Sequence, residues 1–298
     1  IHPEPGRYEF ALADSMVSYA LENNMAVIGH VLVWHSQTPG WVFLDSLGNT
    51  LSREALLERM KEHISTVVGH YRGRVTGWDV VNEAVEEDGS LRQTKWLQII
   101  GEDYIEKAFQ YAHEADPDAE LYYNDYNNEE RAKRSGVIPI IKDLHEKGIR
   151  IDGVGIQGHW HLDSPDFSIV DESIQEYAAL GVKVMITEME INVLPTPVWL
   201  YGAEISKMAA YRDSLNPYVE GLPDSVETQL ADRYSALFSV LLKNSDAVSR
   251  VTFWGVNDAY SWKNDWPIPG RTNYPLLFDR SYQPKPAYYA VINEVKKK

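Results

Sequence analysis

The chain has 298 residues, of which 44% are hydrophobic and 24% charged, so it is long enough for one large domain or two small ones. Its 28 Lys and Arg against 44 Asp and Glu give a formal net charge of −16, which argues against nucleic acid or an anionic membrane surface as a partner. The absence of cysteine excludes disulfides, thiolate metal sites and cysteine nucleophiles, and no apolar run is long enough for a membrane span.

Short apolar or β-branched runs alternate with amphipathic runs along the chain, which is typical of strand–helix units around a parallel sheet. We expect six strands, at residues 27–34, 75–82, 120–125, 153–159, 183–188 and 250–256. Helix starts are predicted at Ser52, Ser135 and Ser225, and helix ends at residues 22–24 and 147–148. No Gly/Ser linker or Pro repeat divides the chain, so we predict a single domain.

Two long segments interrupt this alternation, at residues 192–224 and 264–274. The first is rich in Pro and Tyr, and the second is rich in Pro and Gly. Both should lie at the carboxyl-end face of the sheet, where long loops often carry function.

Polar residues gather at the ends of the predicted strands, where parallel α/β folds place their reactive groups. Glu83 and Glu188 each directly follow an apolar run, and a carboxylate buried there is costly unless it is hydrogen-bonded or functional. A Glu at an arbitrary position is usually a surface or capping residue, but the strand-end position favours function. Two carboxylates across one cleft are what glycosidic bond cleavage requires, one to protonate the departing oxygen and one to attack the anomeric carbon or activate water.

Other side chains near these strand ends have both functional and structural interpretations. Glu190, two residues after Glu188, projects to the same side of an extended strand and either supports it or lines the rim. Asp79 lies in mid-strand, and we expect it to be a buried partner of an Arg or His. The tryptophans at strand ends and in the last loop are expected to stack on a sugar in a cleft, because their flat faces are apolar. They are Trp34, Trp254, Trp262 and Trp266.

The histidines suggest a metal site as an alternative, since His159 and His161 share one side of a strand. No third and fourth ligand has the usual spacing, so hydrogen bonds to a sugar or carboxylate are the favoured use. We therefore predict no metal, and keep a metal-dependent hydrolase as a lesser alternative.

Several motifs resemble glycoside hydrolase family 10, in that family's order along the whole chain. They are GHVLVWH (29–35), WDVVNEA (78–84), YNDYN (123–127), GIQGH (155–159), ITE (186–188), VTFWGV (251–256) and GRTNYPLLFD (270–279). The resemblance implies a retaining endo-1,4-β-xylanase on a (β/α)8 TIM barrel of the α/β class. We expect it to act on xylan or xylo-oligosaccharides without a metal or an organic cofactor.

The resemblance also implies roles for individual residues. Glu83 would be the general acid/base, Glu188 the nucleophile, and Asn82 a contact of the 2-hydroxyl of the cleaved sugar. His159 would contact the nucleophile, and Glu190 stands where the family usually has Asp. The remaining substrate-binding residues would be Trp34, His35, Gln157, Trp254 and Trp262 around that sugar, with Tyr126 and Asn127 on the leaving-group side. Retention predicts carboxyl groups about 5 to 5.5 Å apart.

The strand count departs from the family pattern, because a (β/α)8 barrel needs eight strands and we find six. We therefore expect the first two strand units to be absent, leaving an N-terminally incomplete catalytic domain over residues 1–298. An open barrel would expose sheet edges, so we expect a missing N-terminal segment or an inserted carbohydrate-binding module in a longer polypeptide. A non-catalytic xylan-binding barrel is the alternative function. Since xylan lies outside the cell, we expect a secreted, periplasmic or cell-surface protein.

Overall fold

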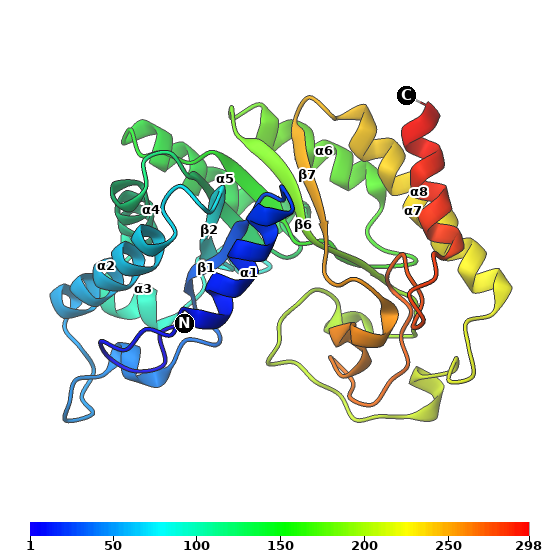
Figure 1. Cartoon of the computed structure of the whole chain (residues 1–298), viewed down its shortest axis with the longest axis horizontal. Helices are drawn as coiled ribbons and strands as arrows, with labels where there is room; N and C mark the ends of the chain where they lie inside the picture. Colours follow the sequence, from blue (N-terminus) through cyan, green and yellow to red (C-terminus); the bar gives the residue numbers. More distant parts are fainter. Residues whose placement is uncertain (298) are drawn as a thin grey trace. The chain divides into compact units, whose positions relative to one another are not determined.

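The computed structural model describes residues 1–297, so residue 298 of the predicted domain lies outside the described part. The chain forms two compact units (Figure 1). The first contains residues 1–125 and 135–154, and the second contains residues 126–134 and those from 155 on. Within residues 1–297, no helix combines the length and the apolar character that crossing a bilayer requires.

The first unit contains the parallel strands β1 (Ile28–Trp34), β2 (Gly77–Asn82) and β3 (Glu120–Asp125), with β2 in the middle. Every residue of β2 is buried, as expected for a strand covered on both faces. The register pairs Asn82 with Trp34 on one side and with Asn124 on the other. The carboxyl ends of the three strands are therefore level, and the polar residues there are neighbours.

The helices of the first unit are α1 (Ala11–Glu22), α2 (Arg53–His70), α3 (Lys95–Ile100) and α4 (Tyr104–Ala115), and the 3-10 turn η1 (Gly40–Phe43) precedes α2. Helix α2 begins as predicted, because the Ser52 side chain accepts a hydrogen bond from the Ala55 amide. Its apolar stripe of Leu56, Met60 and Ile64 is fully buried. Helices α2 and α4 lie side by side and contact the strands (Figure 1).

The second unit contains the parallel strands β5 (His159–His161), β6 (Lys183–Asn192) and β7 (Val248–Phe253). Strand β6 is central and pairs with both others, and His159 lies opposite Glu190. Strand β4 (Gly153–Ile156) and helix α5 (Arg131–Glu146) contain residues of both units. The buried strand β6 thus carries two carboxylates, Glu188 and Glu190, on one side.

The helices of the second unit are α6 (Phe167–Ala178), α7 (Asp224–Lys243) and α8 (Pro286–Lys297). Helix α7 lies beside α8 (Figure 1) and also contacts α6, while α6 contacts β6. The apolar stripe of α7 is buried through Leu230, Leu237 and Leu241. Short 3-10 turns shape the long loops, and they are η2 (Val198–Leu200), η3 (Asp213–Leu215), η4 (Asp258–Tyr260) and η5 (Trp262–Asn264).

The strand prediction needs correction in number and extent, because residues 1–297 contain seven strands rather than six. The expected strand 153–159 is interrupted at Gly158, whose φ of +81° is incompatible with a continuous strand, so β4 and β5 are separate. The expected strand 183–188 continues to Asn192, since Glu190 and Asn192 find hydrogen-bond partners in the interior. The last strand begins and ends earlier than the predicted 250–256.

Two of the predicted helix starts are wrong. Helix α5 begins at Arg131, so Ser135 lies inside it, and α7 begins at Asp224 after Pro223, so Ser225 is its second residue. The predicted helix ends are confirmed, because α1 ends at Glu22 and α5 ends just before Gly148, which has a φ of +68°.

Candidate active site

Glu83 follows β2 directly and has an unusual backbone conformation. Its φ is +56°, in the left-handed region that costs a non-glycine residue roughly 1–3 kcal/mol. Its N–H donates to the Asn124 carbonyl at 2.9 Å, and its carbonyl accepts from Arg92 Nε at 3.0 Å. Two neighbouring segments therefore hold Glu83 in a conformation that it would not adopt unaided, as is common at functional positions.

Glu83 is only 4% exposed, and its carboxylate faces a neutral donor. Trp34 Nε1 donates to Glu83 Oε2 at 2.7 Å, and His35 Nδ1 lies 4.0 Å from the same oxygen. Trp34 is itself held at its carbonyl, which accepts from Trp96 Nε1 at 2.9 Å and from Thr38 Oγ1 at 2.7 Å. The predicted residues Trp34, His35 and Glu83 are thus brought together within the first unit.

Asn82, the neighbour of Glu83, is oriented by the adjacent strand. Asn124 Nδ2 donates to Asn82 Oδ1 at 3.0 Å, and both side chains are buried. Asp79, further back on β2, accepts from His30 Nδ1 at 2.9 Å. The prediction that Asp79 is a buried partner of a basic residue is therefore confirmed.

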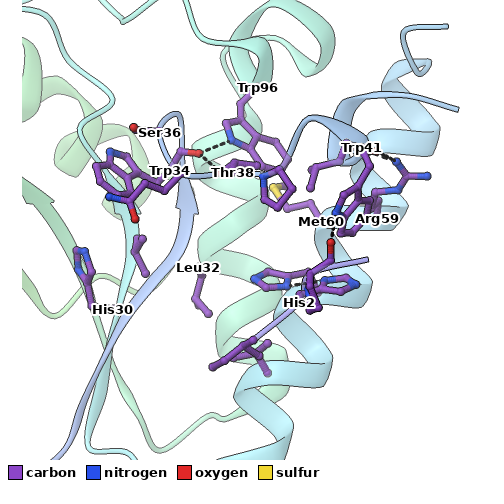
Figure 2. Close-up of a pocket in the computed structure, with 18 of the residues that line it drawn as sticks. His2, His30, Leu32, Trp34, Ser36, Thr38, Trp41, Arg59, Met60 and Trp96 are labelled. Atoms are coloured by element: carbon purple, nitrogen blue, oxygen red, sulfur yellow. Dashed lines mark hydrogen bonds between the residues drawn. The ribbon is translucent and has the colours of Figure 1, made fainter. Parts of the chain in front are cut away.

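A cavity of about 480 Å³ lies beside β1 in the first unit (Figure 2). Its walls come from residues 1–3, from β1 and the segment after it, and from α2. Trp34 lies on this wall, and Figure 2 shows Trp96 donating to its carbonyl. Trp34 therefore both borders an open space and hydrogen-bonds Glu83, an arrangement suited to holding an apolar sugar face near that carboxyl.

In the second unit, Glu188 lies within β6 and contacts a histidine. Its N–H donates to the Gln157 carbonyl at 2.8 Å, which places these two predicted residues side by side. His159 Nε2 lies 3.2 Å from Glu188 Oε2, and His159 Nδ1 lies 2.8 Å from Glu190 Oε1. All three side chains are buried, so His159 bridges two carboxylates away from bulk water.

This bridge raises the pKa of His159. Burial alone lowers the pKa, but the hydrogen bonds and negative charges of Glu188 and Glu190 outweigh burial, and the net pKa lies above 6.5. A histidine can donate to both carboxylates at once only as the imidazolium. Glu188 therefore faces a cationic donor, whereas Glu83 faces the neutral Trp34 indole.

The aromatic residues of the last loop are arranged around this bridge. Trp262 Nε1 donates to Glu190 Oε1 at 2.5 Å, and its ring lies 5.1 Å from that of His159. Trp254 is 37% exposed with its ring 6.4 Å from His159, so it has a face open to a ligand. Trp266 is only 8% exposed and stacks on Trp262 at 4.4 Å, so it supports Trp262 instead of offering its own surface to a sugar.

Tyr126 and Asn127 lie against the long loop 192–224. A Cβ added at Gly202 would lie 2.8 Å from Asn127 Nδ2 and 2.9 Å from the Tyr126 ring, so only glycine allows this approach. Asn127 has a φ of +52°, and Lys133 Nζ lies 3.5 Å over the Tyr126 ring. The structure thus places the two predicted leaving-group-side residues next to the loop that we expected to be functional.

The two histidines of β5 are both engaged in hydrogen bonds. His161 Nδ1 accepts from Asn192 Nδ2 at 3.0 Å, and its ring stacks on Tyr201 at 3.7 Å. Burial lowers the pKa of His161 to about 2. No group of three His, Asp or Glu side chains within residues 1–297 is arranged to hold a metal ion. The described contacts of His159 and His161 thus lend the metal-dependent alternative no support.

Sequence reasoning missed three charged residues of this region. Arg92 holds the Glu83 backbone, and Lys263 lies 3.7 Å from Glu190 Oε1. Glu129 accepts from Trp160 Nε1 at 2.6 Å, and burial raises its pKa to about 7. The position of Lys263 between Trp262 and Trp266 in the sequence was a signal that could have identified it. Arg92 and Glu129 have no distinguishing sequence pattern around them.

Two buried carboxylates with unequal donors, on parallel strand–helix units, are the side chains that a glycoside hydrolase of the α/β class requires. A family model described as glycosyl hydrolase family 10 matches residues 1–294. The chain belongs to glycosyl hydrolase family 10.

The chain is similar over most of its length to proteins named as xylanases. It is 47% identical to endo-1,4-beta-xylanase A of Xylanibacter ruminicola, over 98% of this chain and 79% of that protein. Among solved structures, a GH10 endoxylanase retrieved from a sugarcane soil metagenome has a TM-score of 0.94 at 47% identity, covering 96% of this chain and 83% of that one. Xylanase 10B from Thermotoga petrophila RKU-1 in complex with xylobiose has a TM-score of 0.85 at 39% identity, covering 100% and 82%. The parallel strands and helices agree with the TIM-barrel class.

The expected loss of the first two strand units is not confirmed. The comparisons support neither a missing N-terminal segment nor an inserted carbohydrate-binding module.

Proposed function

We propose that the chain is an endo-1,4-β-xylanase that hydrolyses xylan or xylo-oligosaccharides. The observation that carries the proposal is the pair of buried carboxylates, Glu83 and Glu188, in a chain of this family. Relatives at 44–47% identity are named as xylanases, which favours catalysis over the alternative of a sugar-binding barrel without activity. We also propose that the two compact units form one catalytic domain.

The proposed mechanism is a double displacement with retention of configuration. In the first step the Glu188 carboxylate attacks the anomeric carbon while the Glu83 carboxylic acid gives its proton to the departing glycosidic oxygen. In the second step the Glu83 carboxylate takes a proton from water, the water oxygen bonds to the anomeric carbon, and Glu188 departs as carboxylate. Two inversions at one carbon leave the configuration unchanged.

The contacts within each unit support this division of labour. An imidazolium donor stabilises the ionised form of a carboxylate, and His159 offers one to Glu188. Glu83 faces the neutral indole of Trp34 and must exchange a proton in each step, for which a cationic neighbour is less suitable. Nothing in this arrangement requires a cofactor.

The remaining predicted residues are proposed as sugar contacts. Asn82, fixed by Asn124, would hold the 2-hydroxyl of the cleaved xylose, where hydrogen bonds strengthen in the transition state. The rings of Trp34, Trp254 and Trp262 would stack on the sugar. His35 and Gln157 would bind the same sugar, and Tyr126 and Asn127 would bind the leaving-group side. Since xylan is an extracellular polymer, we also propose that the protein is secreted, periplasmic or at the cell surface.

The test is release of reducing ends from xylan by the purified chain, with the anomer of the first product followed by ¹H NMR. We expect hydrolysis in which the β-anomer appears before mutarotation. Binding of xylan without hydrolysis would favour the sugar-binding barrel, and an α-anomer appearing first would refute the double displacement. Treatment with a chelator should leave the rate unchanged, and loss of activity would revive the metal-dependent alternative.

A further inference from the structure

Lys263 is a buried cation that the proposed mechanism does not use. Its side chain is 2% exposed, and its Nζ lies 4.5 Å from the centroid of the Trp262 ring and 4.4 Å from that of Trp266. The only carboxylate oxygen near Nζ within the described residues is Glu190 Oε1, at 3.7 Å. A lysine is almost never buried in this way unless it is paired.

Glu190 concentrates its interactions on that one oxygen. Oε1 accepts from Trp262 Nε1 at 2.5 Å and from His159 Nδ1 at 2.8 Å, while Oε2 is buried without a hydrogen-bond partner among residues 1–297. An ionised carboxylate with one bare oxygen is expensive in a buried site unless a cation lies close by. Lys263 is a second cation beside this carboxylate, because the His159 imidazolium and the Lys263 ammonium both lie near Glu190 Oε1.

We propose that Lys263 is a positioning residue that, through Glu190 and His159, keeps the Glu188 carboxylate ionised and oriented for attack. The inference rests on the proposed function, because it takes Glu188 as the nucleophile. With Lys263 charged, two carboxylates, Glu188 and Glu190, are balanced by two cations, Lys263 and the His159 imidazolium. Without the Lys263 charge, Glu188, Glu190 and the His159 imidazolium carry a net negative charge, so this buried cluster binds an additional proton more readily.

The surroundings of Lys263 determine the pH range in which its ammonium group is charged. Burial lowers the pKa of Lys263 to about 8, Glu190 on β6 opposes this decrease, and Arg271 in the last loop adds to it. His161 on β5 also faces Lys263 but is neutral, because burial lowers its pKa to about 2. Lys263 is therefore charged below about pH 8 and loses its effect above it.

The first test is the pH dependence of kcat/KM for xylan in Lys263→Met, which removes the charge and keeps the apolar stem. We expect the acid limb to move to higher pH by about one unit, the low end of the pKa shift that a nearby charge causes. Above pH 8 the curves of the parent and the variant should converge, because Lys263 of the parent loses its proton there. Lys263→Arg keeps the positive charge, so its acid limb should lie at the same pH as that of the parent. An equal loss of activity at every pH, or an unmoved limb, would reduce Lys263 to a packing residue.

The second test does not depend on catalysis, so it separates failure of this inference from failure of the proposed function. The His159 imidazole of the intact protein is titrated by ¹⁵N NMR, with its resonance assigned by His159→Gln. Its midpoint should rise by about one pH unit in Lys263→Met, since a nearby positive charge is removed. An unchanged midpoint would overturn the proposal even if the parent hydrolyses xylan.

Lys285 provides a matched control in the same unit. It is also buried, but it pairs with Asp258 at 2.8 Å and does not contact Glu190. Lys285→Met should lower thermal stability and leave the acid limb where it is. Thermal unfolding of all variants shows which are folded, and Lys263→Gln serves as the neutral variant if Lys263→Met does not fold.

Discussion

The two proposed catalytic carboxylates are held in different ways. Glu83 follows a strand, has a strained backbone conformation fixed by Asn124 and Arg92, and meets the neutral donor Trp34. Glu188 lies within β6, where the pairing with β7 is irregular between Ile186 and Met189, and it meets His159, which a second carboxylate keeps cationic. Both groups donate a backbone hydrogen bond to a neighbouring segment, but Glu83 also has a left-handed backbone conformation, whereas Glu188 has a charged side-chain donor.

The largest expected effect comes from removing the nucleophile. Glu188→Gln should lower kcat on both xylan and aryl xylobiosides by a factor on the order of 10⁴ or more, because no covalent intermediate can form. Initial rates on the two substrates provide the measurement. Appreciable activity on either substrate would show that Glu188 is not the attacking group.

Removing the proposed acid should separate the two substrates. Glu83→Ala should lose about 10²–10⁴-fold in kcat on xylan, the usual range for a general acid, but much less in the first step on an aryl xylobioside with a good leaving group. Added azide should restore turnover by replacing water and should give a β-xylobiosyl azide. An equal loss on both substrates would contradict the assignment of Glu83.

The charged donor on the Glu188 side predicts a pH-dependent stability. Because the folded pKa of His159 lies above its unfolded value of 6.5, its contribution is fully present below pH 6.5 and is lost as pH rises through the folded pKa. Chemical denaturation should show that His159→Gln lowers the free energy of unfolding by about 2 kcal/mol at pH 5.5 and by less at pH 9. Ser52→Ala, which removes the cap of α2, should instead cost about 1 kcal/mol at both pH values.

Removing the neutral donor of Glu83, the Trp34 indole N–H, should have a smaller effect on activity. Trp34→Phe removes the indole N–H from Glu83 Oε2 but keeps an aromatic face, so kcat/KM on xylan should fall by about tenfold, as for one hydrogen bond to a charged group. Steady-state kinetics at the pH optimum provide the measurement. A loss as large as that of Glu83→Ala would mean that the indole does more than position the carboxyl.

The sequence predicted the regular part of the fold and the position of Glu83 directly after a strand, but Glu188 lies within β6 and not at its end. Strand 120–125 has the predicted bounds. Ser52 caps the amino end of α2, as its hydroxyl side chain predicts. Strand β6 was predicted too short because Glu190 and Asn192 are polar, and only tertiary hydrogen bonds make them buried strand residues. Ser135 resembles a helix cap in sequence, yet the helix has already begun at Arg131.

The electrostatic part of the site was much less visible in the sequence. Spacing indicated that Glu188 and Glu190 share a side, but the contact of Lys263 with Glu190 joins positions 73 residues apart. The left-handed conformation of Glu83 likewise depends on Asn124 and Arg92, which belong to other segments. Contacts of this kind follow from packing, so local pattern cannot predict them.

The most direct test of the central claim is to inactivate the protein with a 2-deoxy-2-fluoro-xylobioside that carries a good leaving group and to map the labelled peptide by mass spectrometry. Covalent double displacement predicts one fluoro-xylobiosyl group on each molecule, attached to Glu188. A label on Glu83 or Glu190, or no label while the same compound is turned over without delay, would contradict the account.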